Sequence, residues 1–298
     1  MITIRKIKTI KEYHDCETLQ QKVWQFTERE IIPLNELLTI QKNGGLVLGA
    51  FSRSRPAPAT AGRERDGDKP CKLIGFIFGF PGLSHGRLIH CSRMLAVLPT
   101  YRNTSIGARL KFAQRQFALK QGINLITWTF DPLQSLNAYF NIVKLGVIIR
   151  KYETNLYGPS SSILNQGMAT DRFLAEWRIK DKFFGHPRKK YTNPARARDE
   201  SRIVNPTYYN KNGLLVCSRP KLDIKFSSRA KRGENFILVE IPFNIMSLKK
   251  SDAALAGDWR KKTRQIFISY FNKSYIITNF IVRDTNKQRR SFYVLRKI

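Results

Sequence analysis

Hydrophobic and polar residues follow two different patterns along the first 180 positions. The helical pattern, with apolar residues three and four apart, covers residues 12–32, 105–121 and 137–146. The strand pattern, short runs rich in β-branched and aromatic side chains, covers residues 46–51, 72–80, 88–98, 123–130 and 147–158. We expect Pro33, Pro81 and Pro99 to end three of these segments and Gly122 to cap the helix over 105–121. This order of elements predicts one α/β domain over residues 1–185.

Two polar segments interrupt these patterns. Residues 52–70 contain Pro, Gly, Arg and Asp with hardly any large apolar side chain, so we expect a flexible basic insertion between two strands. Residues 186–202 are rich in proline and charge and are expected to form a linker. A smaller C-terminal α+β unit is predicted over residues 203–298. Its expected elements are strands at 213–218, 236–241, 274–283 and 291–296 and a helix around 250–271.

Composition narrows the class of protein. The 298 residues include 42% hydrophobic and 11% aromatic side chains, a content that excludes disorder throughout the chain. The chain carries 53 Lys and Arg against 22 Asp and Glu, a net charge of +31, which attracts polyanions of any kind. Non-specific nucleic-acid binding is therefore an expected side property. The sequence shows no helix-turn-helix, zinc-finger or RNP-type motif.

No apolar run approaches the length of a transmembrane helix, and the N-terminus lacks the apolar core of a signal peptide. We therefore expect a cytoplasmic protein without a membrane partner. The four cysteines are far apart, with no CxxC pair and no Cys–His spacing typical of zinc, so no metal site is expected. The oligomeric state is not indicated.

The most informative stretch is PTYRNTSIGARLK, which joins the strand at 88–98 to the helix at 105. The first N–H groups of a helix have no partner within it, and together with the helix dipole they favour a phosphate or pyrophosphate. Gly107 and Ala108 leave room for a ligand to approach the backbone closely. A strand–turn–helix with one glycine is common, so spacing alone leaves phosphate binding as one possibility among several.

The segment MLAVLPTYRNTSIGARL resembles the acyl-coenzyme A binding motif of the GNAT superfamily of N-acyltransferases, V-x-P-x-x-R-x-x-G-x-G/A. Val97, Pro99, Arg102 and Gly107 match this pattern, and Ser105 replaces its first glycine. The strand at 123–130 and the helix that ends in Lys144-Leu145-Gly146 are similar to the family's second conserved block. Further segments resemble an uncharacterised bacterial branch of the superfamily: ITWTFDPLQSLNAYFN, YETNLYG, TDRFLAEW, LVEIP, WRKKTR and the terminal SFYVL.

This resemblance implies the GNAT fold, a mixed and mostly antiparallel central sheet with splayed central strands, flanked by helices. It also implies direct acyl transfer, in a ternary complex, from acetyl-CoA or another acyl-CoA such as succinyl-CoA. The acceptor would be a primary amine of a small molecule such as an amino acid, and the reaction needs no metal. The residues implied to bind the coenzyme are Leu95, Ala96, Val97, Arg102, Asn103, Thr104, Ser105, Ile106, Gly107, Ala108 and Asn137.

The acid and the base of the reaction depend on weaker signals. Many relatives place a tyrosine in the helix before the conserved glycine, where this chain has Ile142, so Tyr139 is the nearby alternative for the general acid. Asp131 is the only acidic residue between 101 and 150 and could act as the base, but Asp131-Pro132 is also a natural turn. His90 is a packed histidine or a catalytic one.

Two pairs of residues are candidates for binding the acceptor. Trp128 and Phe130 could line its pocket, or they could pack in the core. Arg260 and Arg264 lie four apart on one helix face and could hold a carboxylate of the acceptor or of the acyl group, with a solvated basic face as the alternative. Asp171, Arg172, Glu176 and Trp177 have no role that the sequence indicates.

Two alternative functions stay open. One is a nucleic-acid-binding protein that uses its positive surface. The other is a protein that binds CoA without transferring an acyl group, which the isoleucine at position 142 leaves possible.

Overall fold

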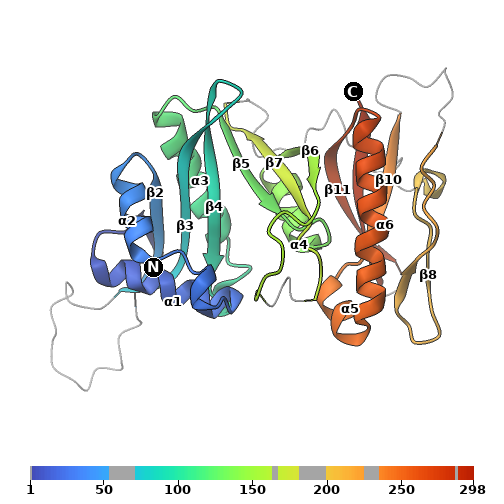
Figure 1. Cartoon of the computed structure of the whole chain (residues 1–298), viewed down its shortest axis with the longest axis horizontal. Coiled ribbons are helices and arrows are strands. Elements are labelled where there is room, and N and C mark those ends of the chain that lie inside the picture. Colours follow the sequence, from blue (N-terminus) through green and yellow to red (C-terminus); the bar gives the residue numbers. More distant parts are fainter. Residues whose placement is uncertain (1, 54–70, 163–166, 181–198, 225–234, 286–287) are drawn as a thin grey trace. The chain divides into compact units, whose positions relative to one another are not determined.

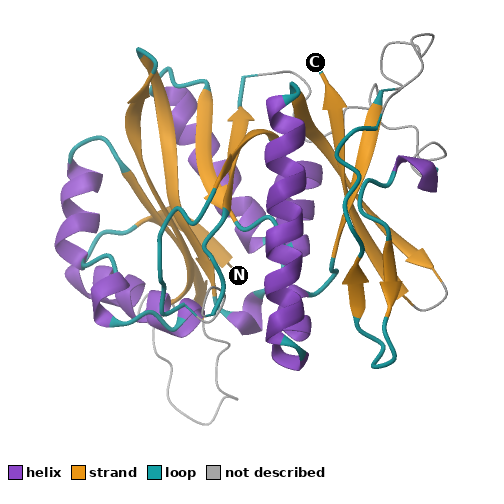
Figure 2. Ribbon diagram, turned by 45° about the vertical axis from the view of Figure 1, so that its right-hand side comes forward, coloured by secondary structure: helices purple, strands orange, loops and turns teal. Residues whose placement is uncertain are grey.

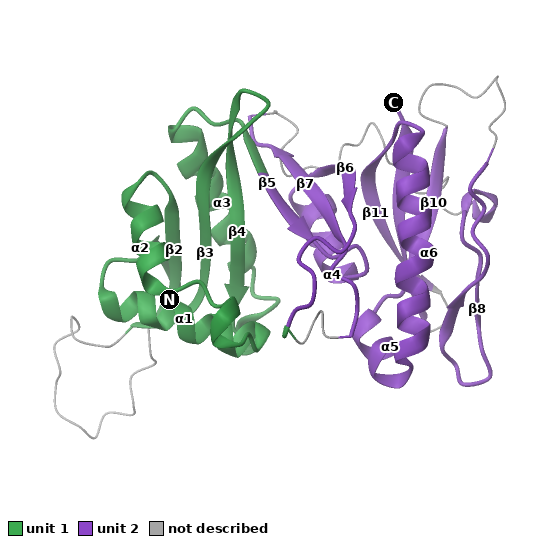
Figure 3. Cartoon of the chain, in the orientation of Figure 1, with its two compact units in different colours: residues 1–126, 161–163 green, residues 127–160, 164–298 purple. Residues whose placement is uncertain are grey.

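The computed structural model describes residues 2–53, 71–162, 167–180, 199–224, 235–285 and 288–298 (Figure 1). The expected insertion at 52–70 and the expected linker at 186–202 lie almost entirely outside the described residues. The chain divides into two compact units, which are described separately (Figure 3). Unit 1 comprises residues 1–126 and 161–163, and unit 2 comprises residues 127–160 and 164–298.

Unit 1 is a four-stranded antiparallel sheet with helices. Its strands lie in the order β1-β2-β3-β4. The elements are β1 (Ile2–Lys6), α1 (Ile10–Trp24), α2 (Leu34–Lys42), β2 (Leu46–Arg53), β3 (Cys71–Ser84), β4 (Arg87–Val97) and α3 (Ile106–Lys120). Short 3-10 turns lie at Glu28–Glu30 and Pro99–Tyr101.

Two boundaries in unit 1 differ from the sequence prediction. The helix predicted over 12–32 ends at Trp24, because Gln25 adopts a left-handed conformation with φ 56°, and α2 follows Pro33 as a separate helix. The strand predicted to stop at Pro81 continues to Ser84. Residues 80–84 of β3 pair with β4, whereas the pairing with β2 ends at Gly79. Pro81 therefore lies where β3 has become an edge strand, a position at which a missing N–H is tolerated.

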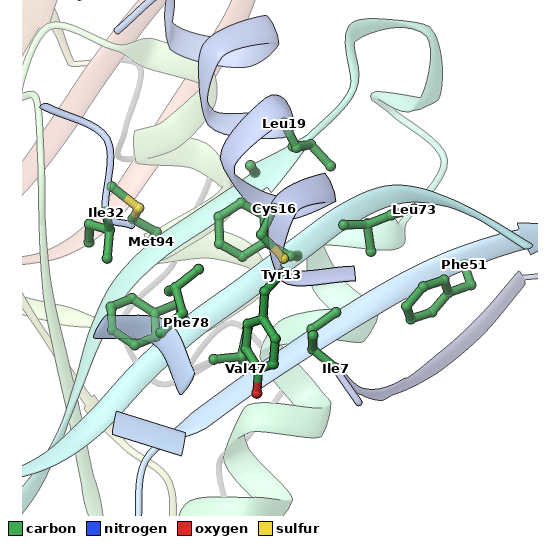
Figure 4. Packing of buried hydrophobic residues seen from close by; sticks show 13 residues of the cluster. Ile7, Tyr13, Cys16, Leu19, Ile32, Val47, Phe51, Leu73, Phe78 and Met94 are labelled. Atoms are coloured by element: carbon green, nitrogen blue, oxygen red, sulfur yellow. The ribbon is translucent and has the colours of Figure 1, made fainter. Parts of the chain in front are cut away.

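Alternating side chains of β2 build two cores on the two faces of this sheet. Val47 and Phe51 point to one face, where Tyr13, Cys16 and Leu19 of α1 cover them (Figure 4). Leu46 and Leu48 point to the other face and pack under α3. The helix contributes Ile106 and Leu110 to that second core. The buried side chains of α3 therefore fix the helix, and the turn that precedes it, against the sheet.

Unit 2 contains the remaining strands in the order β5-β7-β6-β11-β12-β10, and β8 and β9 form a separate two-stranded sheet. The elements of its first part are β5 (Leu125–Phe130, from residue 127 in unit 2), α4 (Ser135–Ala138), a π-helical turn (Tyr139–Lys144), β6 (Ile148–Glu153) and β7 (Arg172–Arg178). Those of its second part are a 3-10 turn (Glu200–Arg202), β8 (Thr207–Tyr209), β9 (Leu215–Cys217), β10 (Phe236–Ile241), α5 (Ile245–Ser251), α6 (Ala253–Asn272), β11 (Tyr275–Thr285) and β12 (Gln288–Lys297).

The core of unit 2 is a cluster of aromatic rings contributed by its strands and by the long helix α6. The ribbon of this helix is the longest in Figure 2. Phe173 of β7 is fully buried at its centre. Its ring lies 4.7 Å from Phe267 of α6 and 5.4 Å from Tyr293 of β12, measured between ring centroids. Phe130, Tyr152 and Phe271 contact the same ring. The C-terminal strands and α6 therefore share one core with β5, β6 and β7.

The six strands of the larger sheet in unit 2 form two sets of three, and the chain builds both sets in the same order. On one side of the β6–β11 junction lie β6, β7 and β5, and on the other lie β11, β12 and β10. In each set the chain forms the outermost strand first, then helices, then the innermost strand and finally the middle one. Unit 2 thus contains the same β–α–β–β order twice.

The predicted fold class is confirmed. The structure is α/β, the pairings β1–β2, β2–β3, β3–β4, β6–β7, β11–β12 and β10–β12 are antiparallel, and helices flank the strands. The C-terminal strands and the helix predicted around 250–271 are present close to their expected positions. Among the described residues, no helix is both long and apolar enough to span a bilayer.

Candidate functional site

The turn between β4 and α3 leaves the first N–H groups of the helix without a side-chain cap. Asn103 and Ser105 both adopt left-handed conformations, with φ 63° and 62°, before α3 begins at Ile106. Ser105 is the N-cap, yet its side chain makes no capping hydrogen bond, so it does not occupy the first N–H groups of the helix. A Cβ atom on Gly107 would meet only Leu95 Cδ2, at 3.8 Å. Packing within the protein therefore does not require a glycine there, and a ligand could approach this backbone.

The segment of sequence that contains this turn has no acidic residues. Residues 71–130 contain eight Lys and Arg and no Asp or Glu. The positive end of the α3 dipole adds to this field at the same turn. Both features are of the kind that attracts an anion to a helix N-terminus, and the role of this turn stays a prediction.

Some backbone N–H groups of β4 make no hydrogen bond to the neighbouring strand β3. Met94 pairs with Phe78 and Ser92 with Gly79, so Arg93 is the extra residue of a β-bulge. The Leu98 N–H donates to Ile74 O of β3. Because backbone groups of successive strand residues point to opposite sides, the N–H groups of Leu95 and Val97 point away from β3. These are the two residues whose backbone the family resemblance assigns to the pantetheine arm.

The other residues predicted to bind the coenzyme divide between the units. Ala96, Arg102 and Thr104 lie in unit 1 with the turn, and the Thr104 hydroxyl donates to Tyr101 O. Asn137 is exposed on α4 in unit 2. Asn137 and the turn are thus described in separate units, and its role stays a prediction.

His90 is a packed histidine. It is fully buried, and its Nε2 lies 3.1 Å from Gln114 Nε2 of α3. Beside it the Lys111 ammonium group donates to the Ser92 hydroxyl at 2.9 Å. Burial, and to a smaller extent the Lys111 charge, lowers the pKa of His90 to about 4. The imidazole is neutral near pH 7 and has no access to a ligand at the surface.

This low pKa makes a prediction for acid stability. The unfolded chain binds a proton at His90 below about pH 6.5 and the folded chain does not, so stability is lost as the pH falls from about 6.5 towards 4. We expect the free energy of unfolding to fall by about 2–3 kcal/mol more between pH 7 and 4.5 in the wild type than in His90→Gln. Urea unfolding at both pH values measures this difference, and equal losses in the two proteins would contradict it.

Asp131 forms an ion pair at the end of β5. Its Oδ2 accepts a hydrogen bond from Arg260 Nη2 of α6 at 2.8 Å, and its Oδ1 accepts one from the Leu133 N–H at 2.8 Å. Its backbone carbonyl accepts from Gln134 N, which closes a turn. Both carboxylate oxygens thus have partners, and the turn that the sequence left as an alternative is present. The role of Asp131 as a base stays a prediction.

Arg264 is engaged by Asp171 one helical turn further along α6. Its Nε and Nη2 donate to the two oxygens of Asp171, both at 2.8 Å. The Tyr152 hydroxyl and the Asn155 N–H donate to the same buried carboxylate. Burial raises the pKa of Asp171, but these hydrogen bonds outweigh it and the net shift is downward. The sequence indicated no role for Asp171, and the structure shows that it anchors α6 to β6 and β7.

The remaining candidates lie in different surroundings. Phe130 is buried in the aromatic core, the alternative that the sequence left open. Trp128 is partly exposed and packs edge-to-face on Trp177, with ring centroids 6.0 Å apart. Tyr139 is exposed, with the Lys144 ammonium 5.7 Å from its ring centre, and Ile142 is buried.

Sequence reasoning missed Tyr157. Its hydroxyl lies 2.7 Å from the Thr129 hydroxyl of β5, and the Arg172 guanidinium lies 5.3 Å from its ring centre. The contact joins residues 28 positions apart through a loop, so no periodicity in the sequence could have indicated it. The exposed Tyr157 phenol thus lies against β5 at Thr129, the residue that follows Trp128.

Metal ligation has no support in the described part of the chain. There, no group of three or more His, Cys, Asp or Glu side chains is placed to hold a metal ion. All four cysteines are free thiols, and Cys16 and Cys217 are buried.

No family model and no curated protein matches this chain. Among solved structures, the chain is similar to one chain of the NatC complex bound to Gag peptide and CoA, with 15% sequence identity and a TM-score of 0.45, covering 59% of this chain and 98% of that one. It is similar to a putative acetyltransferase of the GNAT family from Desulfovibrio desulfuricans, with 13% identity and a TM-score of 0.43, covering 60% and 99%. It is also similar to a GNAT-family acetyltransferase from Streptococcus pneumoniae, with 15% identity and a TM-score of 0.43, covering 59% and 98%.

Proposed function

We propose that this protein is an N-acyltransferase that moves an acetyl or other short acyl group from coenzyme A to the amine of a small molecule in the cytoplasm. The observation that carries the proposal is the bulged strand, turn and uncapped helix of unit 1. There, the uncapped N-terminus of α3 follows a turn that contains Arg102, within a segment of sequence that has no acidic residues. Coenzyme A, with phosphates at one end and amides along its arm, matches such a site.

The chain would hold the coenzyme mainly through its backbone. N–H groups of residues 103–108 would bind the pyrophosphate, and Arg102 would add a charge-assisted contact. The outward backbone groups of Leu95 and Val97 would bind the pantetheine amides. The bound thioester supplies the activated acyl group. A strand N–H such as that of Leu95 would stabilise the oxyanion that forms when the amine attacks.

For proton transfer, the two candidates that the sequence offers are kept as proposals. Asp131 is the proposed base and Tyr139 the proposed acid. The exposure of Tyr139 supports this role, whereas the Arg260 ion pair restricts Asp131. Trp128 is proposed to line the acceptor site. Orientation of the amine beside the thioester would supply much of the rate enhancement.

Calorimetric titration with acetyl-CoA tests the coenzyme site. We expect stoichiometric, micromolar binding that persists at moderate salt, because much of the contact is to backbone groups. Gly107→Trp should weaken binding at least about tenfold, since its side chain would fill the ligand side of the turn. Gly257→Trp on α6 is the control, because a Cβ there meets nothing within 4 Å and Gly257 lies outside the turn. Equal binding by both variants would contradict the proposal.

Nucleic-acid binding is the second candidate, favoured by the net charge of +31. It predicts that an oligonucleotide binds with an affinity that falls steeply with salt, and that Gly107→Trp has no effect. If only the oligonucleotide binds, the charged surface and not the β4–α3 turn is the functional site. A protein that binds acetyl-CoA but turns over no amine would instead be a CoA-binding protein without transferase activity.

A further inference from the structure

The tip of the β3–β4 hairpin in unit 1 carries two exposed leucines. Leu83 and Leu88 lie opposite each other on the two strands, and they are 72% and 60% exposed. Residues directly opposite each other in an antiparallel pair have Cβ atoms about 4.5–5.5 Å apart, so the two side chains form one apolar patch. Contiguous apolar patches, unlike apolar residues scattered singly, mark interaction sites.

The hairpin carries this pair beyond the neighbouring strand of the sheet. β2 pairs with β3 only as far as Gly79, so residues 80–84 of β3 pair with β4 alone (Figure 1). The turn at the tip consists of His85 and Gly86, with φ 47° and 70°, the left-handed conformations of a tight two-residue turn. The leucines therefore lie on a projecting segment whose strands are paired up to the turn.

Two other segments of unit 1 lie beside the base of this projection. The turn between α2 and β2 contains Gly44, whose carbonyl accepts a hydrogen bond of 2.8 Å from Gln121 Nε2, just after α3. A Cβ atom on Gly44 would lie 3.9 Å from Pro81 Cγ of β3. The α2–β2 turn, the end of α3 and the hairpin thus meet at one end of unit 1.

This end of unit 1 is basic. The three segments that meet there contain three exposed basic side chains and no Asp or Glu. The segments are residues 42–46, 81–88 and 119–122, and the basic side chains are Lys42, Arg87 and Lys120. Together with Leu83 and Leu88, we call these side chains the basic–apolar end of unit 1.

An anionic lipid bilayer is the partner that fits both features. Its headgroups carry negative charge, and apolar side chains on a projecting tip can enter the boundary between headgroups and acyl chains. A nucleic acid would neutralise the basic side chains but leave the leucines in water. An acidic protein would need a groove shaped to the tip, whereas the net charge of +31 suits a partner that is negative over a wide area.

We propose that the basic–apolar end of unit 1 binds the surface of an anionic bilayer, with the two leucines inserted among the headgroups and the three basic side chains against them. The sequence prediction of no membrane partner considered spanning segments and signal peptides, and a contact through a hairpin tip needs neither. Such a contact is independent of the proposed acyl transfer, because the tip precedes β4 and the proposed coenzyme turn follows it.

Co-sedimentation of the full chain with lipid vesicles measures this binding. We expect vesicles of phosphatidylcholine and phosphatidylserine to bind at least about tenfold more tightly than vesicles of phosphatidylcholine alone, and the affinity to fall as salt is added. Leu83→Ser/Leu88→Ser should weaken binding to the anionic vesicles at least about tenfold. Leu136→Ser is the matched control and should bind as the wild type does, because Leu136 is 70% exposed and lies on α4 in unit 2.

A second paired variant tests the tip in the opposite direction. Leu83→Trp/Leu88→Trp should strengthen binding to the anionic vesicles, because tryptophan prefers the interface between membrane and water. Melting temperatures accompany each measurement, and if the paired serine variant is less stable than the wild type, the tryptophan variant decides.

Two triple variants test whether the positive charge acts at this end of unit 1. The first is Lys42→Gln/Arg87→Gln/Lys120→Gln. The second is Lys211→Gln/Arg219→Gln/Lys221→Gln, which removes the same charge from exposed positions in unit 2. The first should weaken vesicle binding at least about tenfold more than the second, because only charges near the headgroups contribute strongly.

Three results would overturn the proposal: no binding of the wild type to anionic vesicles, undiminished binding by Leu83→Ser/Leu88→Ser, or equal losses in the two triple variants. An oligonucleotide is titrated separately, and if it binds while the vesicles do not, the positive surface serves nucleic acid and not a membrane. Acetyl-CoA titration of Leu83→Ser/Leu88→Ser should match that of the wild type. Vesicle binding without coenzyme binding would refute the acyltransferase alone, and the reverse result would refute the membrane contact alone.

Discussion

Replacing Phe173 with alanine is expected to lower the free energy of unfolding by about 3–5 kcal/mol, which is enough to unfold many domains near 37 °C. The ring is fully buried and contacts five other aromatic rings. Its removal leaves a cavity between β7 and α6 that these rigid neighbours cannot refill. Urea unfolding followed by tryptophan fluorescence measures the loss.

Two variants calibrate this result. Phe173→Leu fills most of the space and should cost clearly less than the alanine variant. Phe112→Ala removes the same atoms from a more exposed position on α3 and should cost clearly less than Phe173→Ala. Similar losses for Phe112→Ala and Phe173→Ala would show that the aromatic cluster does not hold α6 to β7.

Breaking the Asp131–Arg260 ion pair is expected to cause the second largest loss in the free energy of unfolding. Asp131→Leu or Arg260→Met alone leaves the opposite charge buried without its partner, and each should cost about 3–5 kcal/mol. The double variant removes both charges and should cost much less than the two single losses together. A double-mutant cycle on urea unfolding should therefore give a coupling energy of at least about 2 kcal/mol.

The cycle also separates structure from chemistry at Asp131. If the double variant is stable and binds acetyl-CoA normally but turns over no amine, a role of Asp131 or Arg260 in the reaction is supported. If it retains full turnover, the proposed base is wrong and the pair is structural only. Coupling near zero would show that solvent already screens the pair.

The part of the candidate site that could be predicted from the sequence is formed by residues that follow one another along the chain. The sequence predicts a strand over 88–98, its end at Pro99, a helix over 105–121 and a cap at Gly122. Each of these predictions depends only on residues within or next to the segment concerned. The structure has β4, the turn and α3 there. The helix over 12–32 was predicted too long, because the apolar spacing continues past Gln25 while the backbone turns left-handed at that residue.

The part that could not be predicted depends on pairs that the fold brings together. Asp131 and Arg260 are 129 residues apart, and Asp171 and Arg264 are 93 residues apart. The sequence indicates that each side chain is charged, but not which partner neutralises it. Phe130 likewise alternates with polar residues as a pocket-lining residue would, and only the ring of Phe173 shows that it belongs to the core.

The doubled β–α–β–β order of unit 2 has a consequence for how this protein can change in evolution. In a symmetric dimer of identical chains, a substitution in one subunit necessarily occurs in the other as well. Here both halves belong to one chain, so each can vary independently. After β5 the chain has Asp131, whereas after β10 the equivalent place is taken by Pro242, which cannot titrate. One strand end thus carries an ionisable group and the other does not, a difference that two identical subunits could not show.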